Sequence, residues 1–325
     1  MIRRTRTLLG ILAVAAVTAG TALAGSSAQG KVSIAFVGAD LPDPFYITMH
    51  CGASAAAKQF NVDFSWQGTN GVDFHPELTV LNAITQKHPQ GIILAPFDPN
   101  AFIQPVKSIM GGGTPVVTVD GSLSKKVELQ NIRTDNFGAG KVAGAAMGRI
   151  LKGTGATAVV SFSPTVPVQR DRVNGFKAAL AADYPGVKVV SVQYGGADAG
   201  KSAQVTSALL RAHPEINGIY ATDTNDAEGA SSAIRAAGKG GKIKLIAYDA
   251  SPKEVAGLKS GLFDGLVAQA PYDEGFQAVK TLAQVIRGQV KSSAVKYQFG
   301  TGAAFISRAN VSSPKIKKFL YRSSC

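Results

Sequence analysis

The sequence contains few of the residues on which metal centres and catalytic motifs depend. Its 325 residues include two cysteines, Cys51 and Cys325, and four scattered histidines, a spacing that matches no recognised metal site. The chain also lacks a G-x-S-x-G elbow, an H-E-x-x-H pair and a P-loop. We therefore expect no metal, no cofactor and no catalytic residue, and we predict that the protein is not an enzyme.

Acidic residues are fewer than basic ones: 21 Asp and Glu stand against 34 Lys and Arg, for a formal charge of +13. Such a balance can indicate a nucleic-acid partner. However, the lysines are spread along the chain, and no arginine-rich stripe is interleaved with aromatics; the nearest feature is Lys315, Lys317 and Lys318. We expect no nucleic-acid partner, although a basic surface would suit an acidic partner or an anionic membrane face.

Long apolar runs are missing after residue 30, so we expect no membrane span in the mature protein. Residues 1–24 combine three early arginines, an apolar stretch from Leu8 to Leu23 and the cleavage pattern Ala22-Leu23-Ala24. The stretch is too short and too rich in Ala, Gly and Thr for a membrane anchor. It is predicted to be a secretory signal peptide, and the mature protein is therefore expected to be soluble and exported.

The two cysteines have two interpretations. In an oxidising compartment Cys51 and Cys325 could form a disulfide. Cys51 lies on the apolar side of a predicted helix, however, and fits a buried small hydrophobic residue. The pattern favours the second interpretation, and it leaves the role of the last residues open.

Aromatic residues are also scarce, at 7%, whereas glycine and alanine are plentiful, which suits close packing of helices on a sheet. From Lys31 onward, apolar strands alternate with helices. Strands are predicted at 32–38, 62–68, 91–97, 115–121, 129–135, 156–164, 187–194, 216–223, 242–250, 265–271 and 296–300, with helices between them. Near-continuous apolar strands indicate parallel sheets covered on both faces. Two successive runs of similar size predict two doubly wound, Rossmann-like α/β lobes.

Polar side chains collect where these predicted strands end. Asp43 precedes Pro44 at a helix start, so it is placed as an N-cap, and the aromatic rings of Phe45 and Tyr46 follow it. Taken alone, this stretch fits core packing as well as ligand contact. The other strand-end residues are Asp120, Arg170, Asp223, Asp249 and Gln269. Because ligands bind at the carboxyl ends of parallel strands, the set predicts a polyhydroxylated ligand between the two lobes.

These segments, in this order, make the chain resemble the ribose/galactose-type periplasmic binding proteins, whose ligand core is also found in LacI-like repressors. The resemblance covers residues 31–300. It rests on Asp43-Pro44-Phe45-Tyr46, VVTVDG ending at Asp120, TDNFGAGKVAG at 134–144, Arg170 with NGF at 174–176, ATD at Asp223, IAYDASP around Asp249 and VAQAP around Gln269. It implies the type I periplasmic binding protein fold, with two lobes joined by a three-strand hinge.

By this resemblance the lobes and the tail have definite bounds. The first lobe is expected at 31–133 plus 271–295, the second at 134–270 plus 296–310, and a C-terminal tail at 311–325. The family implies a monomeric periplasmic protein that closes on a sugar or polyol and delivers it to the permease subunits of an ABC importer. Which sugar it binds is left open.

The resemblance also implies roles for the strand-end residues. Phe45 and Tyr46 would lie against the C–H face of a sugar ring, and Arg170 would contact ring or anomeric oxygens. Asp43, Asp120, Asp223, Asp249 and Gln269 would bind hydroxyls. Gly121 and Ala197 stand where many members carry an arginine and an aromatic residue, and Asp43 and Asp223 replace commoner asparagines. Trp66 could supply the missing stacking surface, although a rim or core position is favoured for it.

Other functions are weighed against this one. Gly138–Ala143 fits the dinucleotide cue G-x-G-x-x-A, but the next strand ends without the acid that a ribose needs, so close helix packing explains the small residues better. Paired carboxylates could hydrolyse a glycoside, but an arginine and aromatics suit holding rather than cleaving. A repressor would need a DNA-binding headpiece where the predicted signal peptide lies. A protein that presents its ligand to a chemoreceptor or sensor kinase is the remaining alternative.

Overall fold

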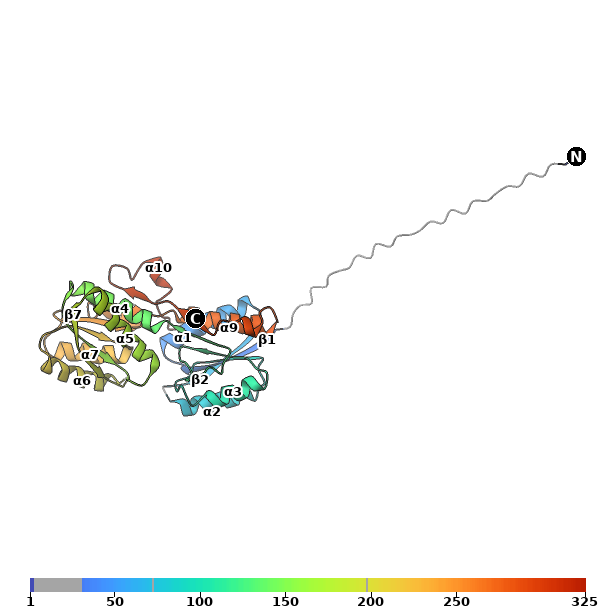
Figure 1. Cartoon of the computed structure of the whole chain (residues 1–325), viewed down its shortest axis with the longest axis horizontal. Coiled ribbons are helices and arrows are strands. Elements are labelled where there is room, and N and C mark those ends of the chain that lie inside the picture. The colour runs from blue at the N-terminus through green and yellow to red at the C-terminus, as the bar shows by residue number, and fades with distance from the viewer. Residues whose placement is uncertain (3–30, 72, 197) are drawn as a thin grey trace. The chain divides into compact units, whose positions relative to one another are not determined.

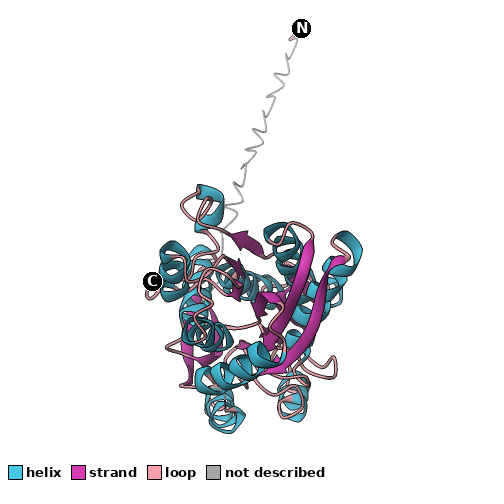
Figure 2. Ribbon diagram, turned by 90° about the vertical axis from the view of Figure 1, so that its left-hand side faces the viewer, coloured by secondary structure: helices cyan, strands magenta, loops and turns pink. Residues whose placement is uncertain are grey.

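The computed structural model describes residues 1–2, 31–71, 73–196 and 198–325. The predicted signal peptide therefore lies outside the described residues apart from Met1 and Ile2, and so does Ala197. Residues 31–325 form one compact unit, in which two sheets lie between layers of helices (Figure 2). Among the described residues, no helix has both the length and the apolar character needed to span a bilayer.

The first sheet has six parallel strands in the order β11-β5-β4-β3-β1-β2. Its strands are β1 Val32–Asp40, β2 Val62–Thr69, β3 Gly91–Leu94, β4 Val116–Val119, β5 Gln130–Thr134 and β11 Gln298–Thr301. The strand order reverses direction at β1, which has β2 on one side and β3 on the other. A reversal of this kind leaves a crevice beyond the carboxyl ends of the two strands.

Helices cover both faces of this sheet. They are α1 Pro44–Gln59, α2 Phe74–Thr85, α3 Ile103–Gly111 and α9 Pro271–Ile286. Side chains of β1 alternate between the faces: Ile34 and Phe36 join the apolar cluster of α1 and α9, whereas Ala35 and Val37 join that of α2 and α3. Figure 1 shows these two helix pairs on opposite sides of the sheet. Burial on both faces explains why the strand is continuously apolar.

The second sheet has the order β12-β10-β9-β8-β6-β7 and reverses in the same way at β6. Its strands are β6 Thr154–Ser161, β7 Gly186–Tyr194, β8 Ile216–Ala221, β9 Lys244–Tyr248, β10 Gly265–Ala268 and β12 Ala304–Ile306. Strand β12 pairs antiparallel with β10, so this sheet is mostly parallel rather than wholly parallel as predicted. Strand β12 is absent from the predicted strands because three residues carry no periodic signal.

Five helices belong to the second lobe: α4 Asn136–Ile150, α5 Pro167–Asp183, α6 Ala199–Ala212, α7 Thr224–Ala236 and α8 Pro252–Ser260. Helices α4 and α5 lie on one side of the sheet, and α6 and α7 lie on the other (Figure 1). A Cβ atom on Gly140 would overlap the carbonyl oxygen of Arg172, and one on Gly175 would overlap that of Phe137. Close helix packing is thus confirmed as the reason for Gly140, whereas a Cβ atom on Gly138 would meet the carboxylate of Asp135, the N-cap of α4.

The chain passes between the two sheets three times: between β5 and α4, between β10 and α9, and between β11 and β12. The prediction that residues 296–310 belong to the second lobe is wrong for Gln298–Thr301, which pairs in parallel with β5 of the first sheet. The buried carboxyl of Glu274 links all three crossings. Its Oε1 accepts hydrogen bonds from Thr134 Oγ1 at 2.9 Å and from Thr301 Oγ1 at 3.0 Å.

The two cysteines form a disulfide with a Cα–Cα distance of 5.3 Å. The favoured interpretation of Cys51 as an unpaired buried residue is therefore wrong. Although Cys51 is buried on α1 as expected, the C-terminal tail returns across 274 residues of sequence to reach it. The tail carries the short helix α10 Pro314–Lys317, and its Val311, Ile316 and Tyr321 side chains are buried in the core.

Candidate functional site

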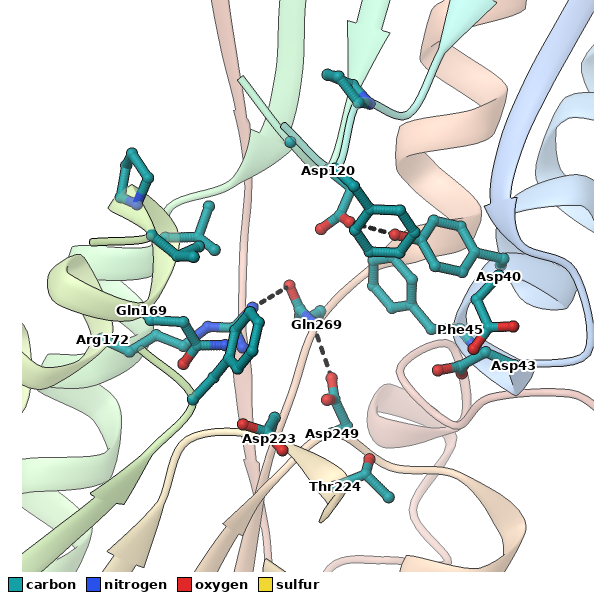
Figure 3. A pocket seen from close by; sticks show the side chains of 18 of the residues that line it. Asp40, Asp43, Phe45, Asp120, Gln169, Arg172, Asp223, Thr224, Asp249 and Gln269 are labelled. Carbon is teal, nitrogen blue, oxygen red and sulfur yellow. Dashed lines mark hydrogen bonds between the residues drawn. The ribbon is translucent and has the colours of Figure 1, made fainter. Parts of the chain in front are cut away.

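A cavity of about 230 Å³ lies beyond the carboxyl ends of the strands of both sheets. Seven of the eight principal residues predicted from the sequence line it: Asp43, Phe45, Tyr46, Asp120, Asp223, Asp249 and Gln269. Figure 3 shows carboxylates from the two lobes facing one another across this space. Residues that follow strands of both sheets therefore meet at one cavity, as expected for ligand sites at the carboxyl ends of parallel strands.

Asp43 is the N-cap of α1, as its position before Pro44 predicted. Its Oδ1 accepts a hydrogen bond from the Phe45 N–H at 2.8 Å. Burial raises the pKa of the Asp43 carboxyl to about 7, the Phe45 N–H opposes the rise, and the carboxylates of Asp249, Asp40 and Asp120 add to it. The side chain is thus held at the cavity wall in an environment that disfavours its charge.

Asp120 and Asp249 occupy corresponding places in the two lobes, directly after β4 and β9. Both have left-handed backbones, with φ of 58° and 79° respectively. This conformation is uncommon for residues other than glycine and recurs at functional sites, where the surrounding structure maintains it. The backbone thus turns sharply at the end of each strand and presents a carboxylate to the cavity.

Protein groups hold one oxygen of each of these carboxylates. Asp120 Oδ2 accepts from the Tyr46 hydroxyl at 2.7 Å, and Asp249 Oδ1 accepts from Gln269 Nε2 at 2.8 Å and from the Tyr321 hydroxyl at 2.7 Å. Within the described residues, the second oxygen of each carboxylate has no protein partner among the hydrogen bonds. Burial raises the pKa of both groups. Each therefore offers a desolvated oxygen to a ligand that donates hydrogen bonds.

Asp223 caps α7, accepting from the Asp226 N–H at 2.9 Å through Oδ1. Its Oδ2 is buried and has no hydrogen-bond partner in the described part of the chain. Burial, followed by the neighbouring Asp226, raises the pKa of Asp223 well above its ordinary value. An unpaired buried oxygen at the edge of a cavity is costly, and a ligand hydroxyl would satisfy it.

Arg170 is the one principal prediction that the structure contradicts. Arg170 is exposed and does not line the cavity, whereas Arg172 is 4% exposed and does. Both residues lie on α5, which begins at Pro167, and positions two apart on a helix point to nearly opposite sides. The sequence places an arginine here, but it does not fix which side of the new helix faces the cavity.

The guanidinium of Arg172 is fixed by three hydrogen bonds. Its Nε donates to Asn136 Oδ1 at 2.8 Å, Nη1 donates to the Thr222 carbonyl at 2.8 Å, and Nη2 donates to Gln269 Oε1 at 3.3 Å. The group also lies 3.7 Å from the centre of the Tyr248 ring. Because a guanidinium carries five N–H groups, two remain for a ligand oxygen.

Aromatic rings supply the apolar part of the wall. Phe45 and Tyr46 are only 7% and 5% exposed and meet edge to face at 5.1 Å between centroids, so each is a core residue as well as a lining residue. Two lining residues were not predicted: Phe97 follows β3, and Phe162 follows β6. Their positions just after strands are the signal by which both could have been predicted, as Asp120 and Asp249 were. An apolar wall with polar edges suits a sugar ring.

Trp66 does not line the cavity, consistent with the favoured rim or core position. Its ring stacks on His50 at 4.8 Å and meets Phe36 edge to face at 4.5 Å. Gly121 does line the cavity, and a Cβ atom there would overlap the carbonyl oxygen of Pro96. The local backbone therefore excludes any side chain at Gly121 and leaves that part of the wall open.

The lining is dominated by hydrogen-bond acceptors. Five carboxylates face a single guanidinium: Asp40, Asp43, Asp120, Asp223 and Asp249 against Arg172. Carboxylates accept hydrogen bonds and a guanidinium only donates them, so the arrangement suits a small ligand with many hydroxyl donors and a ring or carbonyl oxygen. Among the described residues, no group of three or more His, Cys, Asp or Glu side chains is placed to hold a metal ion.

Comparison with known proteins agrees with this geometry. The sequence profile of the periplasmic binding protein domain matches residues 34–289. The chain belongs to this family. It is 29% identical over 273 residues to the D-ribose/D-allose-binding protein of Pseudomonas aeruginosa, covering 80% of this chain and 83% of that protein. It is 26% identical over 270 residues to the ribose import binding protein of Escherichia coli, covering 83% and 90%.

Solved structures of the periplasmic binding protein family show the same two-lobed fold. A solute-binding protein of an ABC transporter from Agrobacterium vitis, bound to α-D-tagatopyranose, superposes with a TM-score of 0.81 at 31% identity, covering 90% of this chain and 100% of that chain. A carbohydrate transporter solute-binding protein from Agrobacterium radiobacter, in complex with D-arabinose, gives a TM-score of 0.79 at 26% identity, covering 90% of this chain and 99% of that chain. The resemblance inferred from the sequence, and the type I fold it implied, are confirmed.

Proposed function

We propose that this protein binds a single monosaccharide, or a related polyol, as the solute-binding component of an ABC importer in the periplasm. The observation that carries the proposal is the convergence of carboxylates from both lobes, with Arg172, on one cavity of about 230 Å³. Clefts that bind drug-sized ligands have volumes of about 300–1,000 Å³. A smaller cavity rich in acceptors suits one sugar ring rather than an oligosaccharide.

In this proposal the sugar is held from both sides. Asp43 and Asp120 of the first lobe and Asp223 and Asp249 of the second accept its hydroxyls, and Arg172 donates to a ring or anomeric oxygen. The aromatic wall that includes Phe45 and Phe162 packs on its C–H faces. Because groups from the two lobes share one ligand, binding favours the closed arrangement and shifts the population towards it.

The moving bodies are proposed to be residues 31–134 with 271–301, and 135–270 with 304–310. The three crossings between the sheets form the hinge, and backbone rotations there would open and close the cleft. Closure excludes water, which strengthens each hydrogen bond to the desolvated carboxylates. The loaded, closed protein would then dock as a monomer on the permease subunits.

Calorimetry tests the proposal directly. Purified protein is titrated with a panel of aldopentoses, aldohexoses, ketohexoses and sugar alcohols that includes ribose, allose and tagatose. We expect at least one sugar to bind with 1:1 stoichiometry and to be recovered unchanged. Asp249→Ala should lower the affinity for that sugar at least tenfold, because it leaves ligand hydroxyls unpaired in a dry cleft. Absence of binding across the panel, or chemical conversion of the sugar, would contradict the proposal.

A further inference from the structure

The C-terminal tail reaches the sugar site without lining it. Tyr321, four residues from the end of the chain, is 6% exposed. Its backbone N–H donates to the Ala250 carbonyl oxygen at 3.0 Å, and its ring meets Phe45 edge to face at 5.7 Å. The tail therefore contacts the second lobe through its backbone and the first lobe through its ring, next to residues that line the cavity.

The hydroxyl of Tyr321 continues the hydrogen-bond chain of the site. It donates to Asp249 Oδ1 at 2.7 Å and accepts from the Gln269 backbone N–H at 3.2 Å. The Gln269 side chain donates to the same Asp249 oxygen at 2.8 Å and accepts from Arg172 at 3.3 Å (Figure 3). Two protein donors thus hold Oδ1 of Asp249, so its other oxygen is the one left for the ligand.

Contacts with the first lobe anchor the residues that follow Tyr321. The Arg322 N–H donates to Thr48 Oγ1 at 2.7 Å, and the Arg322 guanidinium lies 5.0 Å from the centre of the Tyr272 ring. Cys325 is joined to Cys51 of α1 by the disulfide. Because Cys325 follows Tyr321 by four positions, the disulfide limits how far the Tyr321 hydroxyl can move from Asp249.

We propose that Tyr321 is a positioning residue of the sugar site and that the Cys51–Cys325 bond keeps it in place, so that loss of either weakens ligand binding through Asp249. The inference rests on the proposed function. A hydroxyl bonded to a carboxylate restricts the rotation of that group, and Asp249 is a residue whose left-handed backbone already depends on its surroundings. Without the Tyr321 hydroxyl, the carboxylate must be ordered again when the ligand binds.

Dissociation constants of matched variants test the inference. Tyr321→Phe removes one hydrogen bond to a carboxylate. It should raise the dissociation constant of the sugar that binds most tightly about tenfold. Tyr297→Phe is the matched control. Its hydroxyl donates to Glu128 Oε1 at 3.0 Å, and neither residue lines the cavity, so its affinity should stay within about twofold of wild type. Melting temperatures and circular dichroism of the unliganded variants establish that each one folds.

Double-variant cycles separate positioning from general stabilisation. In an Asp249→Ala background, Tyr321→Phe should change the dissociation constant less than about twofold, because the oxygen to which its hydroxyl donates is gone. The paired change Cys51→Ser with Cys325→Ser should weaken binding, and adding Tyr321→Phe to it should cost less than in wild type. Both results would support an effect transmitted through Asp249.

The possible failures are distinct. If wild-type protein binds a sugar and Tyr321→Phe keeps the same dissociation constant within about twofold, the positioning role is overturned while the proposed function stands. If Tyr321→Phe weakens binding equally with and without Asp249→Ala, the hydroxyl does not act through Asp249 and the inference is again overturned. If wild-type protein binds no sugar of the panel, the proposed function fails and the inference fails with it.

Discussion

The substitution Asp43→Asn should stabilise the unliganded protein at neutral pH. Asparagine keeps the oxygen that accepts from the Phe45 N–H at 2.8 Å, so the cap of α1 survives. What disappears is the charge of a carboxyl whose pKa burial raises from 3.8 to about 7. A charge that the folded protein disfavours is thereby replaced by a neutral group of the same shape.

The sign and size of the effect follow from linkage. Between pH 4 and pH 7 the folded protein binds a proton at Asp43 that the unfolded chain does not, so stability falls as pH rises through this window. Each pH unit within the window costs about 1.4 kcal/mol per proton, so the whole shift corresponds to about 4 kcal/mol. The Asp43→Asn variant has no such titrating group. Its free energy of unfolding should equal that of wild type near pH 4 and exceed that of wild type at pH 8.

Urea denaturation from pH 4 to pH 8, at constant ionic strength and without sugar, measures this difference. Asp73→Asn is the control, because Asp73 caps α2 in the same way but its pKa is lowered by hydrogen bonds with His75. That substitution should not stabilise the protein at pH 8. If the Asp43→Asn and wild-type curves run parallel, or if Asp43→Asn is the less stable protein at pH 8, the assignment of Asp43 as a desolvated acid is refuted.

Two further predictions concern the cavity wall. Arg172→Met should weaken sugar binding at least about a hundredfold, since it removes the guanidinium that lines the cavity. The control Arg170→Ala should change the dissociation constant less than about twofold. Equal effects of the two substitutions in calorimetry would contradict the placement of Arg172. Phe45→Ala should weaken binding and also lower the unfolding free energy, measured in urea, by about 3 kcal/mol. The reason is that the ring is 7% exposed and packs on Tyr46 and Tyr321. Unchanged stability would show that Phe45 is not a core residue.

Much of the site could be predicted from the sequence because it follows a local rule. Continuous apolar runs identify strands buried on both faces, and each parallel strand ends at the same edge of its sheet. Asp120 and Asp249 each follow such a run directly, so their positions could be inferred without knowledge of the packing. Phe97 and Phe162 also lie at or near the ends of predicted strands, but an apolar residue at a strand end is typical of core packing as well and is therefore a weaker signal of a ligand site than a carboxylate.

The wrong prediction of Arg170 instead of Arg172 has a different physical reason. Which side of α5 faces the cavity depends on the residue at which the helix begins and on its contact with α4, where Gly140 and Gly175 let the backbones approach closely. A shift of two residues turns a helical side chain by about 200°. Sequence periodicity fixes such a start to within a few residues, which is too coarse to choose between the two arginines.

The class of fold, the two lobes and the strand ends that carry the acids follow from the sequence alone, because alternation, strand burial and helix capping are encoded within short stretches of chain. Three features could be learned only from the folded protein: Arg172 lines the cavity, Gln298–Thr301 extends the first sheet, and Tyr321 reaches Asp249 from a tail held by Cys51. Each of these depends on contacts between segments 72 or more residues apart or on the exact rotation of a helix, and neither has a local signal in the chain.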